Sequence, residues 1–321
     1  MKMKKLCAFF ITLIYCMTIL TGCGKSGLPL DYKQTHTIVS TDRMDNFATG
    51  FAYDLAVADS NVEGMTGATV EETSSAGIFD INKKRVLYAK DIHERLAPAS
   101  LTKVMTALVA MKYGNTEDLI TCSENVTDID YDATRIGLKA GDQLTMNQAL
   151  HALLIDSAND VAIAIAEHVS GDVDSFVALM NKEALDIGAT NTHFVNPHGL
   201  SDNDHYTTAY DMYLMMNAAM EYELFNEIIH MTEYESVYND SMGNEKTMKF
   251  KTTNLFLRGD YSAPGNVTVI GGKTGTTTIA GNCLILLVKD TQGNPYIAVI
   301  MRASTRALVN EEMADILREI T

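Results

Sequence analysis

The sequence predicts an α+β fold: an antiparallel sheet flanked by helices, with a helical subdomain inserted into it. Strand-like segments lie near both ends of the globular part of the chain, at residues 76–89 and 267–301, whereas residues 115–190 carry apolar side chains at helical spacing. Strands from distant parts of a chain can pair in one antiparallel sheet. We therefore expect one sheet, a helical insertion at about residues 115–190, and a functional site where the insertion meets the sheet.

The segment at residues 76–89 is expected to be a β-hairpin, because apolar positions such as Phe79 and Leu87 flank a polar tip at residues 82–84. β-Branched and other strand-forming residues, separated by glycine-containing turns, predict three more strands. These are expected at residues 267–273, 283–289 and 296–301. A last amphipathic helix follows, with apolar positions at Leu308, Ile316, Leu317 and Ile320.

A helix is expected from about Ser100 to Tyr113, with Gly114 closing it. Apolar residues surround most of its circumference, and such a helix belongs inside a domain. Its first turn nevertheless carries a serine.

Residues 115–190 are expected to be helical. Thr145 and Gln148 can form a capping box before an apolar run. The helical pattern breaks at residues 156–159 and then resumes, and Asp172 can cap a further helix.

Residues 1–22 are expected to be a lipoprotein signal peptide. A basic start precedes an apolar run, residues 6–20, that is too short for a comfortable membrane span. The run ends at Leu-Thr-Gly before Cys23, which is the residue expected to carry lipid, and Gly24 fits retention at the outer face of the cytoplasmic membrane, as in a Gram-positive source. The alternative is an ordinary secretory signal or an uncleaved anchor; either way the chain is exported.

Residues 23–46 are polar and aperiodic, which suits a flexible tether between the lipid and a globular domain at residues 47–321. Of the five cysteines, only Cys122 and Cys283 would remain inside that domain, as one bridge or as two unpaired buried thiols. The net charge is −16, and a nucleic-acid partner would need a basic stripe that the sequence lacks.

The string Ser100-Leu-Thr-Lys103 places a hydroxyl and an amine on one face of the predicted helix. A serine becomes a competent nucleophile when a neighbouring base takes its proton. Lysine can be that base where burial or a second cation, such as Lys273, lowers its pKa. The helix N-terminus would also favour a developing oxyanion. Taken alone, Ser100 could instead be an N-cap and Lys103 a solvated side chain.

Two further motifs could complete such a site. Ser157-Ala-Asn159 lies at the break between two helices. Ser157 could relay a proton between Lys103 and a leaving group, and Asn159 could bind a substrate amide, or both could only cap the next helix. Lys273-Thr274-Gly275 ends a predicted strand. A cation and hydroxyls there can receive a carboxylate, and the glycine lets a substrate backbone come close.

The ordered set of serine-x-x-lysine, serine-x-asparagine and lysine-threonine-glycine occurs in β-lactamases and penicillin-binding proteins. From about residue 47 to 321, the chain resembles the D-alanyl-D-alanine carboxypeptidases, which are low-molecular-mass penicillin-binding proteins of the S11 peptidase family. The resemblance also rests on Phe-Val-Asn-Pro-His-Gly-Leu at residues 194–200, Thr-Ala-Tyr-Asp at residues 208–211 and Gly-Gly-Lys-Thr-Gly-Thr-Thr at residues 271–277.

This resemblance implies that Ser100 attacks the carbonyl between the two D-alanines of a peptidoglycan stem peptide, and that water hydrolyses the acyl-enzyme. β-Lactam antibiotics would acylate Ser100 by the same route. Backbone N–H groups of Ser100 and Thr276 would form an oxyanion hole, and neither a cofactor nor a metal is implied. The implied catalytic residues are Ser100, Lys103 and Ser157, and the implied substrate-binding residues are Asn159, Lys273, Thr274, Gly275 and Thr276.

Two departures from the family pattern stand out. Many members carry histidine where Thr276 stands, and many continue into a β-rich C-terminal domain with a membrane helix, which we do not expect here. Lipid on Cys23 would replace that anchor. Three histidines, His193, His198 and His205, could suggest a metal site, but their irregular spacing and the family pattern favour structural hydrogen bonding.

Two alternatives use the same motifs. A class A β-lactamase would need a Glu-x-x-Leu-Asn-like loop, and in residues 160–200 neither Glu167 nor Glu183 is followed by Leu-Asn. An exported sensor that is acylated by penicillin or peptidoglycan without turnover would use the same residues as the enzyme. We see no transmembrane segment or signalling domain, which favours the enzyme.

Overall fold

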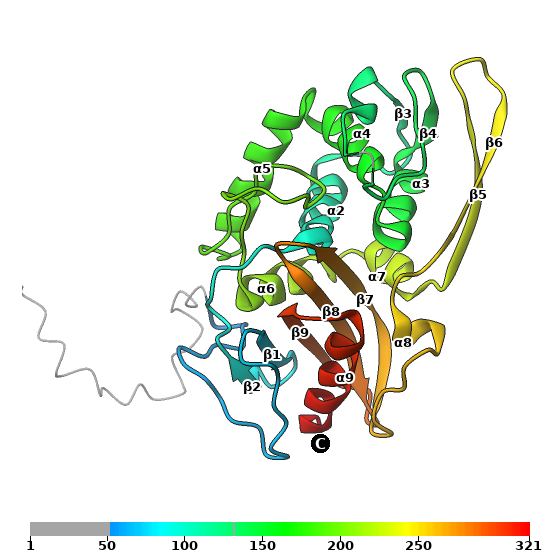
Figure 1. The fold of residues 1–321 in the computed structure, drawn as a ribbon. Helices are drawn as coiled ribbons and strands as arrows, with labels where there is room; N and C mark the ends of the chain where they lie inside the picture. The colour runs from blue at the N-terminus through cyan, green and yellow to red at the C-terminus, as the bar shows by residue number, and fades with distance from the viewer. Residues whose placement is uncertain (1–51, 131) are drawn as a thin grey trace, which may run out of the picture. The chain divides into compact units, whose positions relative to one another are not determined.

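The computed structural model of the chain describes residues 52–130 and 132–321. The predictions for the signal peptide, Cys23 and the tether lie outside these residues. Strands from both ends of the described chain form one antiparallel five-stranded sheet in the order β2-β1-β9-β8-β7, which confirms the predicted fold class and the hairpin (Figure 1). The strands are β1 (Ser75–Asp80), β2 (Arg85–Lys90), β7 (Val267–Thr277), β8 (Gly281–Asp290) and β9 (Pro295–Ala303).

A helical layer covers each face of this sheet. Side chains of β8 and β9 alternate between two cores, as the strand period of two requires. Ile285 and Val299 join the core that contains α6 (Ala209–Ala219), whereas Leu286 and Ile300 join the core beneath α9 (Arg306–Ile316). The predicted last helix is therefore confirmed, and it continues as a short turn, η5 (Leu317–Glu319).

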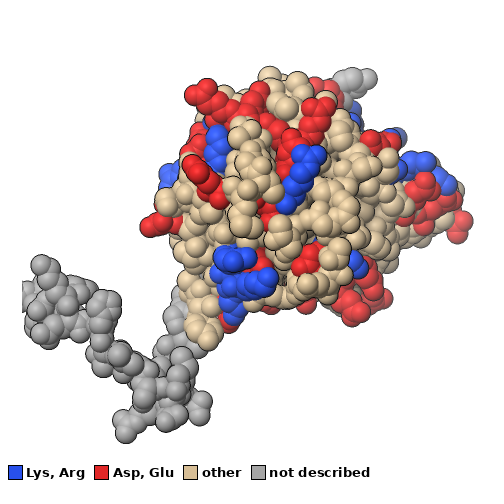
Figure 2. All heavy atoms as spheres, turned by 90° about the horizontal axis from the view of Figure 1, so that it is seen from below, with Lys and Arg blue, Asp and Glu red and all other residues tan. Residues whose placement is uncertain are grey.

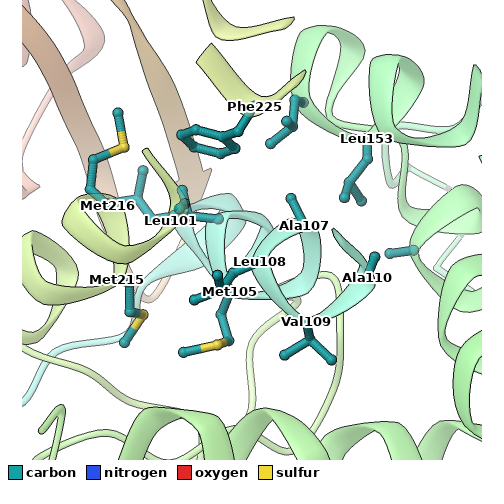
Figure 3. Packing of buried hydrophobic residues seen from close by; sticks show 14 of the residues in the cluster. Leu101, Met105, Ala107, Leu108, Val109, Ala110, Leu153, Met215, Met216 and Phe225 are labelled. Atoms are coloured by element: carbon teal, nitrogen blue, oxygen red, sulfur yellow. The ribbon is translucent and has the colours of Figure 1, made fainter. Parts of the chain in front are cut away.

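The predicted buried helix is α2 (Thr102–Tyr113), with Gly114 as its C-cap. Every residue from Thr102 to Ala110 is buried. Figure 3 shows α2 surrounded by Leu153, Phe225 and two methionines of α6. One detail differs from the expectation, because the turn that carries Ser100 is a separate 3₁₀ turn, η2 (Ala99–Leu101).

The inserted region lies beyond one end of the sheet (Figure 1). The expected capping box of Thr145 and Gln148 and the N-cap at Asp172 are both present. A short π-helix ends at Asp156, where the sequence pattern breaks. The helical elements of this region are η3 (Glu124–Thr127), α3 (Met146–His151), η4 (Ala152–Asp156), α4 (Asn159–Ser170) and α5 (Val173–Asp186).

The expectation that residues 115–190 are helical throughout is wrong at two strands, β3 (Leu119–Thr121) and β4 (Gln143–Thr145). These join β5 (Glu233–Asn239) and β6 (Glu245–Lys251) in a second sheet of order β3-β4-β5-β6. Strands of three residues are too short to show a period, and their partners lie far along the chain. The strands β5 and β6 form a hairpin, which lies in sequence between the helices α7 (Glu223–His230) and α8 (Leu255–Arg258).

The described surface carries charges of both signs. On the face that Figure 2 shows, acidic and basic side chains are interspersed. Cys122 and Cys283 are free and buried, so the interpretation as two unpaired thiols is confirmed. Within residues 52–130 and 132–321, no helix is both long and apolar enough to cross a membrane.

Candidate active site

The three sequence motifs meet at a cavity of about 300 Å³ beside β7. Its lining includes Ser100 from η2, Ser157 from the C-terminal end of the π-helix η4, and Thr274, Gly275 and Thr276 from β7. A second cavity of about 390 Å³ shares Ser100 and Thr276 with the first and adds Asn159. The site therefore lies where the insertion meets the sheet, as predicted, and Ser100 is reached from both cavities.

Lys103 lies beneath Ser100 with its side chain completely buried. Its Nζ is 3.0 Å from Ser100 Oγ, 2.8 Å from Asn159 Oδ1 and 2.6 Å from the carbonyl oxygen of His198. Burial holds the pKa of Lys103 well below its usual range, and the charge of Lys273 lowers it further. The two carbonyl oxygens can only accept, so they take the two hydrogens of a neutral amine. In that neutral form, the lone pair of Lys103 Nζ would be free to accept the proton of the Ser100 hydroxyl.

Lys273 reaches the same site from β7 and is also buried. Its Nζ donates to Ser157 Oγ at 2.9 Å and to the carbonyl oxygen of Thr274 at 2.8 Å. Burial lowers the pKa of Lys273 to about 7, against the opposing effect of the Asp156 carboxylate. The Asp156 carboxylate therefore favours the charged form of Lys273.

Ser157 takes a left-handed backbone conformation, with φ of +68°, directly after the π-helix η4. This conformation ends the helix, and Ser157 lines the cavity. Neither Ser157 nor Asn159 caps α4, whose N-cap is Ala158 without a side-chain bond. The contact of Ser157 with Lys273 is a difference from the expected relay, which began at Lys103.

Both the nitrogen and the oxygen of the Asn159 side-chain amide form hydrogen bonds. Its Nδ2 donates to the carbonyl oxygen of Thr134 at 3.0 Å, and its Oδ1 accepts from Lys103. The next residue, Asp160, is buried and accepts the backbone N–H groups of Gly137 and Leu138 at 2.8 and 3.0 Å. Asp160 thereby holds the segment that carries Thr134. Sequence reasoning missed this role because no local pattern joins Asp160 to residues 136–138.

Two further residues of the cavity were also missed. Thr253 Oγ1 lies 2.6 Å from Thr274 Oγ1, and the guanidinium of Arg306 donates to the carbonyl oxygen of Thr253 at 3.4 Å. Both Thr253 and Arg306 line the cavity beside Ser100. Arg306 is the first residue of α9, and its place near β7 depends on the strand order of the sheet. A position at the start of a predicted helix gave no signal of this.

The three histidines have separate hydrogen-bond partners. His193 Nδ1 lies 2.6 Å from the carbonyl oxygen of Asp204, and His198 Nδ1 accepts the N–H of Leu200. His205 Nε2 lies 2.9 Å from Thr102 Oγ1. Burial lowers the pKa of His198 to about 3 and that of His205 to about 4. The described residues include no cluster of three or more ligand side chains suited to a metal ion.

The fold is similar to that of solved DD-peptidase structures. The crystal structure of the Streptomyces K15 DD-transpeptidase is similar, with a TM-score of 0.69 and 26% identity, over 78% of this chain and 98% of that one. Penicillin-binding protein 5 from Haemophilus influenzae is similar with a TM-score of 0.67 and 28% identity, over 76% and 69% of the two chains.

The chain belongs to the D-alanyl-D-alanine carboxypeptidase family of S11 peptidases, whose profile matches residues 62–305. It is 35% identical to the D-alanyl-D-alanine carboxypeptidase DacF of Bacillus subtilis over 78% of this chain and 63% of that protein. It is 33% identical to DacC of Escherichia coli over 71% of this chain. The matches span 63% and 56% of the length of these two relatives. The resemblance inferred from the motifs is confirmed.

Proposed function

We propose that the protein is a serine D-Ala-D-Ala carboxypeptidase that removes the terminal D-alanine from peptidoglycan stem peptides. The observation that carries this proposal is the environment of Lys103. Its two carbonyl partners and its lowered pKa favour a neutral amine whose lone pair is directed at Ser100 Oγ. Membership of the family supports the choice of substrate.

In the acylation step, Ser100 Oγ bonds to the carbonyl carbon and its proton passes to Lys103 Nζ. The oxygen that gains charge is held by the backbone N–H groups of Ser100 and Thr276. As the C–N bond breaks, the leaving nitrogen takes the proton of Ser157, and Ser157 takes a proton from Lys273. Lys103 ends this step charged and Lys273 neutral, so the two lysines together carry one positive charge before and after it.

Hydrolysis reverses these transfers with water in place of the leaving amine. The water gives its proton through Ser157 to Lys273 while its oxygen attacks the acyl carbon. Lys103 returns a proton to Ser100 Oγ as the ester bond breaks. The same residues therefore serve both steps, and no cofactor takes part in either.

The terminal carboxylate of the substrate would lie in the cavity that Arg306 and Thr274 line. Arg306 can offer two parallel N–H groups to a carboxylate, and the hydroxyls of Thr274 and Thr276 lie along the same wall. Lys273 adds its charge from beneath the wall rather than a direct contact. Asn159, at the opposite side, would orient the substrate amide while Gly275 lets its backbone approach β7.

The test is release of free D-alanine from diacetyl-Lys-D-Ala-D-Ala by the full chain, measured beside labelling with a fluorescent penicillin. We expect both activities, and we expect Ser100→Ala to abolish both. Labelling without release would favour a sensor, and rapid destruction of penicillin would favour a β-lactamase. D-Alanine release that survives in Ser100→Ala would refute the assignment of the nucleophile.

Export and anchoring form a second part of the proposal. Residues 1–22 would act as a signal peptide, Cys23 would receive lipid, and residues 23–46 would link it to the domain. The basic start and the apolar run before Cys23 support this. In cells fed radiolabelled palmitate, the protein should carry the label and Cys23→Ala should not. Label that remains on Cys23→Ala would contradict lipid attachment at this residue.

A further inference from the structure

Ala99, the residue before Ser100, has a left-handed backbone with φ of +48°. A residue with a side chain rarely adopts this conformation, because its Cβ meets the neighbouring carbonyl oxygen. The surroundings leave little other space. A Cβ on Gly199 would come within 1.9 Å of the Ala99 oxygen, and one on Gly275 would come within 3.1 Å of the Ala99 Cβ. Strain of this kind persists where the surrounding structure holds it in place.

A one-way chain of hydrogen bonds ends on Ala99. The N–H of Val195 donates to His205 Nδ1 at 3.1 Å, so the proton of the neutral ring is assigned to Nε2. Nε2 lies 2.9 Å from Thr102 Oγ1 and can donate to it. Thr102 Oγ1 in turn donates to the carbonyl oxygen of Ala99 at 2.8 Å. Every donor in this chain therefore has a single acceptor.

The three residues at the Ala99 end of these hydrogen bonds have almost no contact with solvent. Ala99 is 1% exposed, Thr102 is fully buried and His205 is 2% exposed. Burial lowers the pKa of His205 to about 4, so its ring is neutral near pH 7 and keeps the proton arrangement that the chain needs. A bond from a buried donor to a buried carbonyl is costly to lose. The chain can therefore oppose a return of Ala99 to an ordinary φ.

We propose that His205 and Thr102 are positioning residues: they hold Ala99 in its left-handed conformation and so keep Ser100 Oγ within reach of Lys103 Nζ. This inference rests on the proposed function, because its effect is on acylation of Ser100. Neither residue lines the cavities beside Ser100. Loss of these hydrogen bonds should therefore slow acylation without weakening the initial binding of penicillin or peptide.

The first test compares Thr102→Val, which removes the hydroxyl but keeps the shape, with Thr102→Ser, which keeps the hydroxyl. Acylation of the full chain by a fluorescent penicillin is followed in time and normalised to the active sites titrated at completion. We expect Thr102→Val to slow acylation by about 10- to 100-fold, as a misplaced nucleophile would, and Thr102→Ser to stay close to the wild-type rate. A wild-type rate in Thr102→Val would overturn the inference.

The second test asks whether Thr102 acts through Ala99. Glycine adopts a left-handed φ without strain, so in Ala99→Gly the backbone should depend less on the hydrogen bond from Thr102 to keep this conformation. In a double-mutant cycle, Thr102→Val should therefore slow acylation much less in the Ala99→Gly background than in the wild-type background. Equal losses in both backgrounds would contradict action through the Ala99 backbone.

A matched control separates position from stability. Thr208 is as fully buried as Thr102, and its hydroxyl accepts the N–H of Asp211 at the start of α6. Thr208→Val should lower the melting temperature yet leave the acylation rate per active site unchanged. If Thr208→Val slows acylation as much as Thr102→Val, the effect is general destabilisation and the inference fails. A wild-type chain that penicillin does not acylate would instead refute the proposed function.

Discussion

Lys103 and Lys273 occupy one site with almost the same burial, yet their neighbours differ. Lys103 is 0% exposed and faces two carbonyl oxygens and the charge of Lys273, whereas Lys273 is 1% exposed and lies near the carboxylate of Asp156. Burial opposes charge on both amines, and each repels a proton on the other. Each amine has one acid that raises its pKa, Asp156 for Lys273 and Asp160 for Lys103, but only the pKa of Lys103 is also lowered by the charge of the other lysine. The comparison shows how two identical side chains can serve as a base and as a cation.

The largest expected effect is at the base. Lys103→Arg keeps a long basic side chain, but its guanidinium cannot lose its proton near neutral pH, so this variant should be acylated as slowly as Lys103→Met. We expect both variants to lose about 10²- to 10⁴-fold in the rate of acylation by penicillin. If the arginine variant reacts at the wild-type rate, Lys103 does not act as a base and the contrast between the two lysines is lost.

The next effect is at the cation, and it concerns pH. The charge of Lys273 lowers the pKa of Lys103, so Lys273→Met should raise that pKa. Lys103 would then become protonated at a higher pH, and the acid limb of the acylation profile should move to higher pH. The profile is measured with a fluorescent penicillin over the range in which the fold is stable. An acid limb that stays in place would show that the two amines do not interact.

The wild-type cation should also limit activity on the alkaline side. Lys273, with a pKa of about 7, loses its proton as the pH rises through that value. The kcat/KM for D-alanine release from a peptide with a free terminal carboxylate should therefore decline above about pH 7. A value that holds constant well into the alkaline range would mean that the charge of Lys273 does not contribute to substrate capture.

A smaller effect is expected at Arg306, which lines the cavity beside Ser100. Arg306→Gln should raise KM for diacetyl-Lys-D-Ala-D-Ala by about tenfold, the size of one charge-assisted hydrogen bond. The matched substrate is the same peptide with a terminal amide, whose KM should not change. If both peptides lose equally, Arg306 supports the cavity wall instead of binding a carboxylate.

The smallest effect is expected at Asp160, whose carboxylate raises the pKa of Lys103. Asp160→Asn removes that charge, so the pKa of Lys103 should fall and the acid limb should move to lower pH, opposite to Lys273→Met. Asp142 is a matched control, since it is equally buried and also accepts backbone N–H groups, from Lys139 and Ser241. A similar shift in Asp142→Asn would show that the effect is not specific to Asp160.

Much of the fold could be predicted because it depends on local patterns. The apolar circumference of α2 predicted its burial, and the hairpin of β1 and β2 followed from its polar tip. The strands β3 and β4 could not be predicted, because three residues show no period; β3 pairs only with β4, and the other partner of β4, β5, lies far along the chain. The β5–β6 hairpin was missed as well, because only Tyr238, Met248 and Phe250 of its strands are buried, which leaves little apolar pattern to read.

In the site, too, the residues that were predicted depend on local patterns, and those that were missed depend on distant parts of the chain. Its motif residues were predicted because each lies in a short string whose chemistry can be read locally. Arg306 and Thr253 were missed because only the strand order of the sheet and the packing of α9 bring them to β7. The strained φ of Ala99 and the left-handed turn at Ser157 were also missed, because neither residue is a glycine.

The most direct test of the central claim is the rate at which penicillin acylates the wild-type chain as the pH is varied. If Lys103 is a neutral amine that serves as the base, the rate should fall on the acid side, as that amine becomes protonated, and should also decline above about pH 7, as Lys273 loses the proton that it passes to the leaving nitrogen. A rate that instead climbs steadily with pH toward the pKa of an ordinary lysine, about 10.4, would contradict the account.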